Sequence, residues 1–424
     1  MATKFCKLIC VTGDNNNKYY EMTERGDGNF DVKYGRVNVT EQKDEYPMSK
    51  WDTKYKEKLK KGYKDVTHLV TEKVTDASTP ATTVKVADIT DMAVRTVINQ
   101  LSAYANKTVS DNYEISKESV TQAMVDEAQG IVNELAAQVG KSMDIQRIND
   151  NLLKLYTTIP RKMKHVRLHL INTAEWLEHN FRGNKPSDKE LQESMRRILD
   201  TEQSTLDTMA GQVLLIANQK SIGQVKDTKQ VNMLDQLGIT MSIADDKEVE
   251  MIKKMLGPDA NRLVRVYRTE CNKTKSLYER NLIGASDKKV DMFFHGSRNQ
   301  NWFNILQTGL LIRPSGAVYT GSMFGDGIYF ADKAIKSIGY SSLSGSYWAK
   351  GNSSQGFLGI FATHVGNQKH ITHHNSDCYK LSKNIIRKDG FDSVFAHGGA
   401  DLRNNEYIVY DGAQCTVKYL CELK

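Results

Sequence analysis

The most informative stretch of this sequence is GSMFGDGIYFAD, residues 321–332, where a glycine-rich loop leads into a short strand of bulky apolar residues. Two other segments also place polar residues at the end of an apolar strand. A His295-Gly296-Ser297 turn follows one such strand, and Glu406 begins another strand. The glycine run lacks the Lys-Ser/Thr of a P-loop and does not open a helix, so it does not by itself establish phosphate binding. A histidine after a strand is more often structural than catalytic. These residues alone therefore predict strands with polar ends, and no particular chemistry.

The last third of the chain reads as a compact, strand-rich domain with tight bends. Sixteen of the 29 glycines fall at or after Gly296. Short runs of Val, Ile, Tyr and Phe alternate there with turns. The predicted strands are Met292–Phe294, Gly327–Phe330, Phe357–Phe361 and Glu406–Tyr410.

The middle of the chain, residues 88–222, predicts a helical bundle. Apolar residues follow helical spacing, and glycines and prolines are few. His165 and His169 stand four residues apart, a spacing that can bind zinc on one helix face, but no third ligand accompanies them. Residues 76–87 precede the bundle and, being rich in Thr, Ser and Ala around Pro80, indicate a linker.

Residues 1–75 predict a small antiparallel sheet followed by one amphipathic helix. Asn, Asp and Gly clusters separate the expected strands, which are Phe5–Val11, Lys18–Met22 and Phe30–Arg36. Trp51, Tyr55 and Leu59 recur every four residues, and Ser49 precedes Asp52 in the spacing of a capping box.

The other face of this helix is basic. Seven lysines lie between Lys50 and Lys64, against Asp52 and Glu57. Such a cluster could meet nucleic-acid phosphates. A solvated helix face explains the same charges, and charge alone favours that simpler interpretation.

Bulk properties limit the class of protein. A chain of 424 residues exceeds one hydrophobic core, so two or three domains are expected. The net charge is +7, and the six cysteines form no C-x-x-C pair, which argues against a disulfide framework and indicates a reducing compartment. No run of about 18 apolar residues predicts a membrane span or a membrane partner.

Four ordered blocks carry a family resemblance. Phe294 to Arg298 (FHGSR), Gly309-Leu310, residues 321–332 and Asn405 to Tyr410 (NEYIVY) resemble the signature of the poly(ADP-ribose) polymerase catalytic domain. Upstream, two further segments look like parts of the DNA-dependent members of that family. Leu153 to Pro160 (LKLYTTIP) is similar to a block of their helical regulatory domain, and Tyr34-Gly35-Arg36 with the helix of Lys50 to Tyr63 is similar to their nucleic-acid-sensing WGR domain.

The resemblance implies an α+β multidomain protein. Residues 1–75 would form a WGR-like domain of a small β-sheet plus a helix, and residues 76–87 a linker. Residues 88–222 would form an all-α regulatory bundle, and residues 232–424 a mixed α/β ADP-ribosyltransferase domain built on antiparallel sheets.

The resemblance also implies a site for NAD⁺ as substrate. His295 would hold the adenosine ribose, while the Gly296 backbone and the Ser337 hydroxyl would hold the nicotinamide carboxamide. Tyr340 would stack on the nicotinamide ring, with Tyr329 on the other side. Three further candidates are Ser297 and Arg313 for NAD⁺ binding and Lys336 near the acceptor side.

Glu406 is the expected catalytic carboxylate, with His295, Tyr329 and Lys336 beside it. It would bind the nicotinamide-ribose 2′-hydroxyl and stabilise an oxocarbenium-like transition state. It could also polarise an acceptor hydroxyl, and by resemblance that second role distinguishes polymer-forming members from those that transfer single units.

Two departures from the family pattern affect binding. Leu311 stands where the family often has arginine, and Arg313 could take over its contact. Tyr34 replaces the tryptophan that names the WGR domain. The candidate nucleic-acid contacts are Tyr34, Arg36, Trp51, Lys58, Lys60 and Lys61.

A loop from His370 to Cys378 contains possible zinc ligands, but a solvated loop is the default interpretation and no metal is expected. The predicted activity is poly(ADP-ribose) synthesis on protein acceptors, the protein itself included, stimulated by DNA ends or nicks. The helical bundle would restrict NAD⁺ access until DNA binds. A mono-ADP-ribosyltransferase and an inactive nucleic-acid-binding scaffold remain as alternatives. The expected location is the nucleus in a eukaryote and otherwise the cytoplasm.

Overall fold

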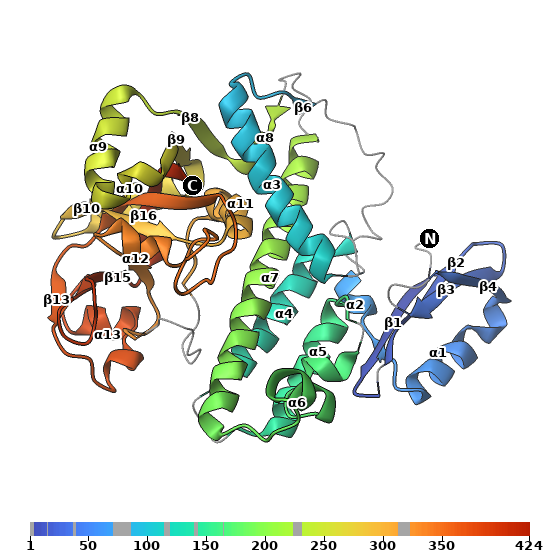
Figure 1. Cartoon of the computed structure of the whole chain (residues 1–424). Helices are drawn as coiled ribbons and strands as arrows, with labels where there is room; N and C mark the ends of the chain where they lie inside the picture. Colours follow the sequence, from blue (N-terminus) through green and yellow to red (C-terminus); the bar gives the residue numbers. More distant parts are fainter. Residues whose placement is uncertain are drawn as a thin grey trace. The chain divides into compact units, whose positions relative to one another are not determined.

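A computed structural model describes residues 4–14, 16–36, 40–70, 86–113, 119–139, 143–163, 165–223, 231–312 and 323–424 (Figure 1). The chain forms two compact units. The N-terminal unit holds the described residues of 1–81 and 107–214, and the C-terminal unit those of 82–106, 215–315 and 321–424. Among the described residues, no helix combines the length and apolar character that crossing a bilayer requires.

The N-terminal unit begins with a five-stranded antiparallel sheet in the order β4-β3-β2-β1-β5. Its strands are β1 (Phe5–Thr12), β2 (Asn16–Glu24), β3 (Asn29–Arg36), β4 (Gln42–Pro47) and β5 (Lys64–Asp65). The three predicted strands are confirmed, and β4 and β5 were not predicted. Their residues are mostly exposed and polar, so they carry no apolar alternation.

The predicted helix is confirmed as α1 (Trp51–Lys60). Trp51 anchors it to the sheet, with its ring edge-on to Phe30 at 5.0 Å. The predicted capping box is wrong, because a 3-10 turn at Met48–Lys50 leads into α1 and no side chain caps the helix.

Helices complete the N-terminal unit, and they share a hydrophobic core with Ile9 and Val11 of β1. They are α2 (Thr67–Val70), α4 (Gln122–Ala136), α5 (Ile145–Thr158), α6 (Ala174–Phe181) and most of α7 (Asp188–Gly223). Threonine and aspartate side chains cap α4, α5 and α6. A buried ion pair joins Arg161 after α5 to Glu202 of α7, and the Arg161 guanidinium lies 4.2 Å from the ring centroid of Tyr113.

The C-terminal unit contains two larger sheets. The first is antiparallel, in the order β10-β12-β16-β9-β8. Its strands are β8 (Ile239–Ile243), β9 (Leu263–Cys271), β10 (Val290–Gly296), β12 (Gly356–His364) and β16 (Cys415–Leu423). The second has the order β11-β15-β14-β13, with only β13 and β14 parallel. Its strands are β11 (Ile328–Phe330), β13 (Gln368–Ile371), β14 (Ser393–Ala396) and β15 (Glu406–Val409). The four predicted strands are confirmed as β10, β11, β12 and β15, with Gly327 and Tyr410 each one residue outside the observed strand.

Short helices surround these sheets: α8 (Met233–Leu237), α9 (Asp246–Leu256), α10 (Asn272–Gly284), α11 (Asn299–Thr308), α12 (Ala334–Ile338) and α13 (Lys383–Lys388). A short parallel pair, β6 (Val86–Ala87) with β7 (Val231–Asn232), also lies in this unit. All strands of the two larger sheets lie within residues 232–424, which the sequence assigns to one catalytic domain.

Helix α3 (Met92–Asn112) divides between the two units after Asn106. Its first part buries Val94, Ile98 and Leu101 in the core that contains Trp302 of α11. Gln100 exchanges amide hydrogen bonds of 2.5 and 3.2 Å with Gln355. The segment 88–222, which the sequence assigns to one helical domain, is thus shared between two units.

Candidate active site

The two sheets of the C-terminal unit are joined where the predicted site residues lie. The backbone N–H of Phe294 in β10 donates to the carbonyl of Ala331 at 2.9 Å, and the N–H of Ala331 donates back at 3.1 Å. This bridge holds the end of β10 against the end of β11. It brings His295 and Tyr329 together from strands of different sheets.

The side chain of His295 has a defined orientation. Its Nδ1 lies 3.0 Å from the carbonyl oxygen of Tyr329. Because a carbonyl only accepts hydrogen bonds, Nδ1 carries the proton, and in the neutral ring Nε2 presents a lone pair. Burial lowers the pKa of His295, which keeps the ring neutral at physiological pH. Nε2 is therefore an acceptor suited to a hydroxyl group.

Gly296 follows at a point where no other residue fits. A Cβ at this position would lie 1.7 Å from the carbonyl oxygen of Ser337 in α12. The buried Ser337 hydroxyl donates to the Phe294 carbonyl at 3.0 Å. The backbone of β10 and the last turn of α12 thus pack in direct contact, and this close approach brings the main chain of Gly296 next to Ser337.

The loop before β11 is held by two tyrosines. The Tyr329 hydroxyl accepts from the N–H of Phe324 and donates to the carbonyl of Gly325, each at 2.9 Å. The Tyr410 hydroxyl donates to the Phe324 carbonyl at 2.6 Å. Burial raises the pKa of Tyr329, so its hydroxyl stays protonated and keeps both bonds. The orientation of its ring is fixed as a result.

Tyr340 lies two residues after α12, and its N–H donates to the Ser337 carbonyl at 3.0 Å. Burial raises the pKa of the Tyr340 hydroxyl, and the negative charge of Glu406 raises it as well. Its ring stacks on Trp348, with centroids 6.1 Å apart and planes 19° apart. One face of Tyr340 is thereby supported by protein.

Glu406 begins β15, paired with Ala396 of β14. The preceding Asn405 donates to Asp332 at 2.7 Å and accepts from the N–H of Gly398 at 2.9 Å, which fixes the entry to the strand. Glu406 is 6% exposed, and its Oε1 forms an ion pair with Lys336 of α12.

The second oxygen of this carboxylate is the most informative atom of the site. Oε2 is buried, and within the described part of the chain it has no hydrogen-bond partner. Burial raises the pKa of Glu406, and the Lys336 ammonium opposes that rise. Because a buried acceptor without a partner is costly, this atom is suited to a hydroxyl donor supplied by a ligand.

Comparison with known proteins identifies the family. Residues 246–424 match the family described as Poly(ADP-ribose) polymerase catalytic domain. The chain is 30% identical over 166 residues to the putative poly [ADP-ribose] polymerase-like protein 100L of Invertebrate iridescent virus 6, in a match that spans 38% of this chain and 87% of that protein. The chain belongs to the poly(ADP-ribose) polymerase family.

Two further relatives show how much of each protein is shared. Uncharacterized protein 101L of the same virus is 36% identical over 163 residues, or 38% of this chain and 66% of that protein. The poly [ADP-ribose] polymerase of Drosophila melanogaster is 34% identical over 155 residues, or 31% of this chain and 15% of that protein. The chain thus spans just under two thirds of 101L and a small part of the fly enzyme.

Membership of this family makes the C-terminal unit an ADP-ribosyltransferase domain with NAD⁺ as its substrate. The geometry fits that substrate at three points: the Nε2 lone pair of His295, the Gly296–Ser337 contact and the unpartnered Oε2 of Glu406. The first and third can accept hydroxyl hydrogens. The second places main-chain groups of Gly296 next to Ser337, whose hydroxyl donates to the Phe294 carbonyl and keeps its lone pairs as acceptors.

The structure brings most of the predicted site residues of this polymerase-family domain together. His295, Tyr329, Lys336, Ser337, Tyr340 and Glu406 are linked through the contacts given above. Ser297 instead anchors α11. Its hydroxyl accepts from the Asn301 amide and its carbonyl accepts from the Trp302 indole, and both partners belong to α11. Leu311 is 56% exposed. Arg313 lies outside the described residues.

Sequence reasoning missed two features of the site. Asp332 and Asn405 position the entry to β15, and their signal was available because both stand inside the quoted family blocks. Trp348 supports Tyr340 from a segment rich in serine and glycine. No pattern in that segment indicates which ring it would contact.

The predicted nucleic-acid residues of this polymerase-family chain occupy different environments. Trp51 is only 4% exposed, so its ring is a core residue and is not presented to a partner. The Lys58 ammonium lies 4.0 Å from the ring centroid of Tyr20 and 5.8 Å from that of the half-buried Tyr34. Lys61 pairs with Glu57 at 2.6 Å, whereas Lys60 is exposed. Arg36 is also exposed.

The loop from His370 to Cys378 has its own internal partners. His370 and His397 share a hydrogen bond of 2.9 Å between their rings. His374 donates from Nε2 to the Met323 carbonyl at 2.9 Å, and the Cys378 thiol contacts Asn375. Among the described residues, no group of three or more His, Cys, Asp and Glu side chains is arranged to hold a metal ion. The contact of His374 makes this loop a support for the loop before β11.

Proposed function

We propose that this chain builds poly(ADP-ribose) on protein acceptors, itself included, releasing nicotinamide, and that DNA ends or nicks activate it. The observation that carries the polymer part is the Glu406 carboxylate, buried, paired on Oε1 with Lys336 and unpartnered on Oε2. Each carboxylate oxygen carries two lone pairs, so beside Lys336 this group can still accept from a hydroxyl of the donor ribose and from an acceptor hydroxyl.

The proposed step is a glycosyl transfer. The bond between ribose C1″ and the cationic nicotinamide nitrogen breaks, and nicotinamide leaves as a neutral molecule with the bonding pair. An acceptor hydroxyl oxygen bonds to C1″, and its proton passes to solvent by way of Glu406. Positive charge develops on the ribose in the transition state, and Glu406 is positioned to stabilise it.

The same geometry supports transfer of a single unit, because Lys336 already occupies one carboxylate oxygen. A mono-ADP-ribosyltransferase therefore stays the second candidate, and product length separates the two. A binding scaffold without activity is the third candidate. Detection of nicotinamide release would exclude it.

Activation by DNA is supported by the exposed lysines of the N-terminal unit. Lys50, Lys56, Lys60 and Lys64 are exposed on or beside α1, and none of them forms an ion pair with a described residue. Such a face favours phosphate groups. In a eukaryotic source this function would place the protein in the nucleus, and otherwise in the cytoplasm.

The test uses labelled NAD⁺ with and without nicked or blunt-ended DNA, with products separated on a sequencing gel. A DNA-stimulated ladder from the intact chain supports the proposal. Glu406→Gln should lower the rate of elongation by about 10²- to 10³-fold, the usual effect of removing one preorganised stabilising group. Products that carry only single ADP-ribose units would favour the mono-ADP-ribosyltransferase. If the protein is folded but releases no nicotinamide, only the binding-scaffold candidate stands.

A further inference from the structure

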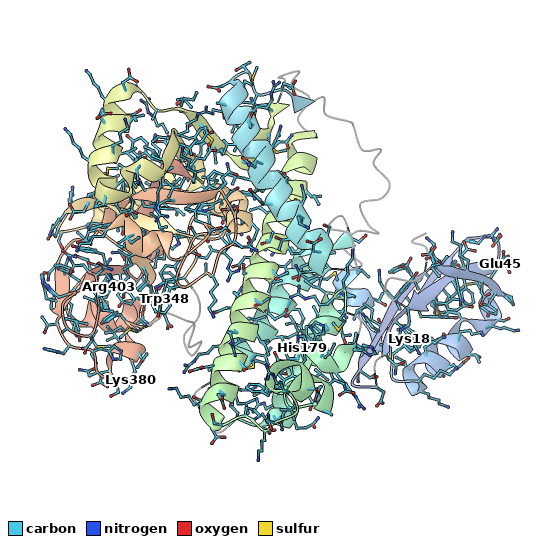
Figure 2. The ribbon with its side chains drawn as sticks, in the orientation of Figure 1. Lys18, Glu45, His179, Trp348, Lys380 and Arg403 are labelled. Atoms are coloured by element: carbon cyan, nitrogen blue, oxygen red, sulfur yellow. The ribbon has the colours of Figure 1, made fainter. Side chains whose placement is uncertain are left out.

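The segment between α12 and β12 exposes two large aromatic rings beside the active site. Tyr347 is 76% exposed and Trp348 is 50% exposed. The other three tryptophans of the chain, Trp51, Trp176 and Trp302, are at most 4% exposed. Figure 2 labels Trp348 on the C-terminal unit. Exposed rings of this size typically mark a binding surface.

The backbone holds these rings in place. The N–H groups of Trp348 and Ala349 both donate to the Gly339 carbonyl, at 2.9 and 3.0 Å. Lys350 has a φ of 47°, a left-handed conformation unusual for lysine. A Cβ at Gly351 would lie 2.3 Å from the Ser342 carbonyl oxygen, so the chain turns in close contact with itself. Strain of this kind persists where surrounding structure enforces it, often at a functional site.

The exposed rings continue the aromatic wall of the active site. Tyr340 lies two residues after α12, whose Lys336 pairs with Glu406, and its ring stacks on Trp348, which meets Tyr347 edge-on at 4.6 Å. Three rings therefore lead to the surface from the end of α12, the helix that holds the ion-pair partner of Glu406. A ligand bound on the outer two would lie beside the place where transfer occurs.

Two cations adjoin the same loop. Lys350 follows Trp348 by two residues and is exposed. Arg298 is exposed and precedes Asn299, whose N–H donates to the Ser342 hydroxyl at 2.9 Å. Neither cation forms an ion pair with any residue that the structure describes. The loop thus combines a stacking surface with positive charge that no described residue neutralises.

We infer that Tyr347 and Trp348, whose planes are 88° apart, form an acceptor platform with two walls. The adenine ring of the ADP-ribose unit at the end of an acceptor stacks on Trp348 and meets Tyr347 with its edge, with Lys350 and Arg298 facing its pyrophosphate. The inference rests on the proposed polymer function. A flat base stacks on aromatic rings, and phosphates favour unpaired cations. A single ADP-ribose unit supplies both groups, whereas a nucleic-acid strand would need a longer basic track than two cations.

Direct binding tests the platform without any turnover. Because Trp348 is the exposed tryptophan, free ADP-ribose should quench the intrinsic fluorescence in a saturable way. Trp348→Phe should remove that quench, and Tyr347→Ala should weaken the affinity about tenfold, as expected for the loss of one aromatic contact. His295→Ala impairs the donor pocket and should leave the quench in place.

Other results would overturn the platform. These are a quench that survives in Trp348→Phe, a quench that disappears in His295→Ala but not in Tyr347→Ala, or a quench by oligo-dA with none by ADP-ribose. Thermal unfolding of each variant confirms that it is folded. Ile283→Ala, a change at a 78% exposed residue of α10, serves as the surface control.

Product length gives a second arm, compared at equal amounts of nicotinamide released. Tyr347→Ala should give shorter products than the intact chain, and Ile283→Ala should not. Unchanged lengths in Tyr347→Ala would count against the platform. If the intact chain itself makes only single units, the polymer proposal fails, and the fluorescence arm still decides whether the platform binds ADP-ribose.

Discussion

Lys336 controls the charge state of Glu406 at short range. Burial raises the pKa of this carboxyl group and the Lys336 ammonium opposes the rise. Catalysis needs the ionised form, so kcat/KM should fall as pH falls through the raised pKa, at higher pH than for an ordinary glutamate near about 4.3. Both effects act on a single side chain and can be separated by mutation.

Lys336→Met removes the opposing charge and should move the acid limb of kcat/KM to still higher pH. The exposed neighbour Lys333 provides a matched control, because Lys333→Met changes the net charge equally without touching the carboxylate. The measurement is the pH profile of nicotinamide release for all three proteins. An acid limb that stays in place or moves down in Lys336→Met would show that the ion pair does not set this pKa.

Gly296 illustrates a different residue-scale constraint, the absence of a side chain. Gly296→Ala would place a Cβ on the Ser337 carbonyl, so β10 and α12 must separate. We expect a raised KM for NAD⁺ and a loss of about 1–3 kcal/mol in the free energy of unfolding. Gly284→Ala is the control, because a Cβ there meets nothing within 4 Å. Calorimetry measures the free energy of unfolding, and initial rates measure the KM. Equal effects of Gly296→Ala and Gly284→Ala would contradict the close contact between Gly296 and Ser337.

At the scale of elements, the buried pair of Arg161 and Glu202 fastens α7 to the segment after α5. Removing one partner leaves an uncompensated buried charge, so Glu202→Ala should destabilise the N-terminal unit by about 3–5 kcal/mol. The pair of Lys154 and Glu127 is largely exposed, and Glu127→Ala should cost less than about 1 kcal/mol. Denaturant unfolding compares them, and similar costs would refute a special role for the buried pair.

Elements with a strong apolar pattern were predictable from sequence. β1, β10, β12 and β15 stand out as short runs of bulky residues, and the residues at the ends of β10 and β15 became the site once the family blocks were matched. β4 lacks such a pattern because five of its six residues are exposed and only Tyr46 is half-buried, with its ring against Phe30.

Long-range pairs could not be predicted at all. Arg161 and Glu202 lie 41 positions apart, and Gln100 and Gln355 lie 255 apart, with no local signal at either end. The contact between Trp348 and Tyr340 could not be predicted either, because it depends on how the loop folds back on Gly339. Only tertiary structure places such partners together.

For the whole molecule, the division of α3 changes how regulation should be tested. Deleting residues 88–222 would remove Val94, Ile98 and Leu101 from the core of the C-terminal unit, so a loss of activity could reflect unfolding alone. Substitutions on the surface of the intact chain avoid that problem, and the exposed lysines of α1 are suitable positions for them.

The double variant Lys56→Glu/Lys60→Glu reverses charge on the exposed face of α1 while leaving Trp51 and its packing against Phe30 intact. If lysine–phosphate pairing activates the enzyme, DNA stimulation should fall at least tenfold and DNA-independent nicotinamide release should not change. The slope of log affinity against log salt should also become shallower by roughly 0.9 for each phosphate that the variant no longer neutralises. Lys247→Glu/Lys254→Glu makes the same charge change on α9 and should keep both stimulation and slope. Equal decreases in the two double variants would mean that net charge, and not the α1 face, governs the response to DNA.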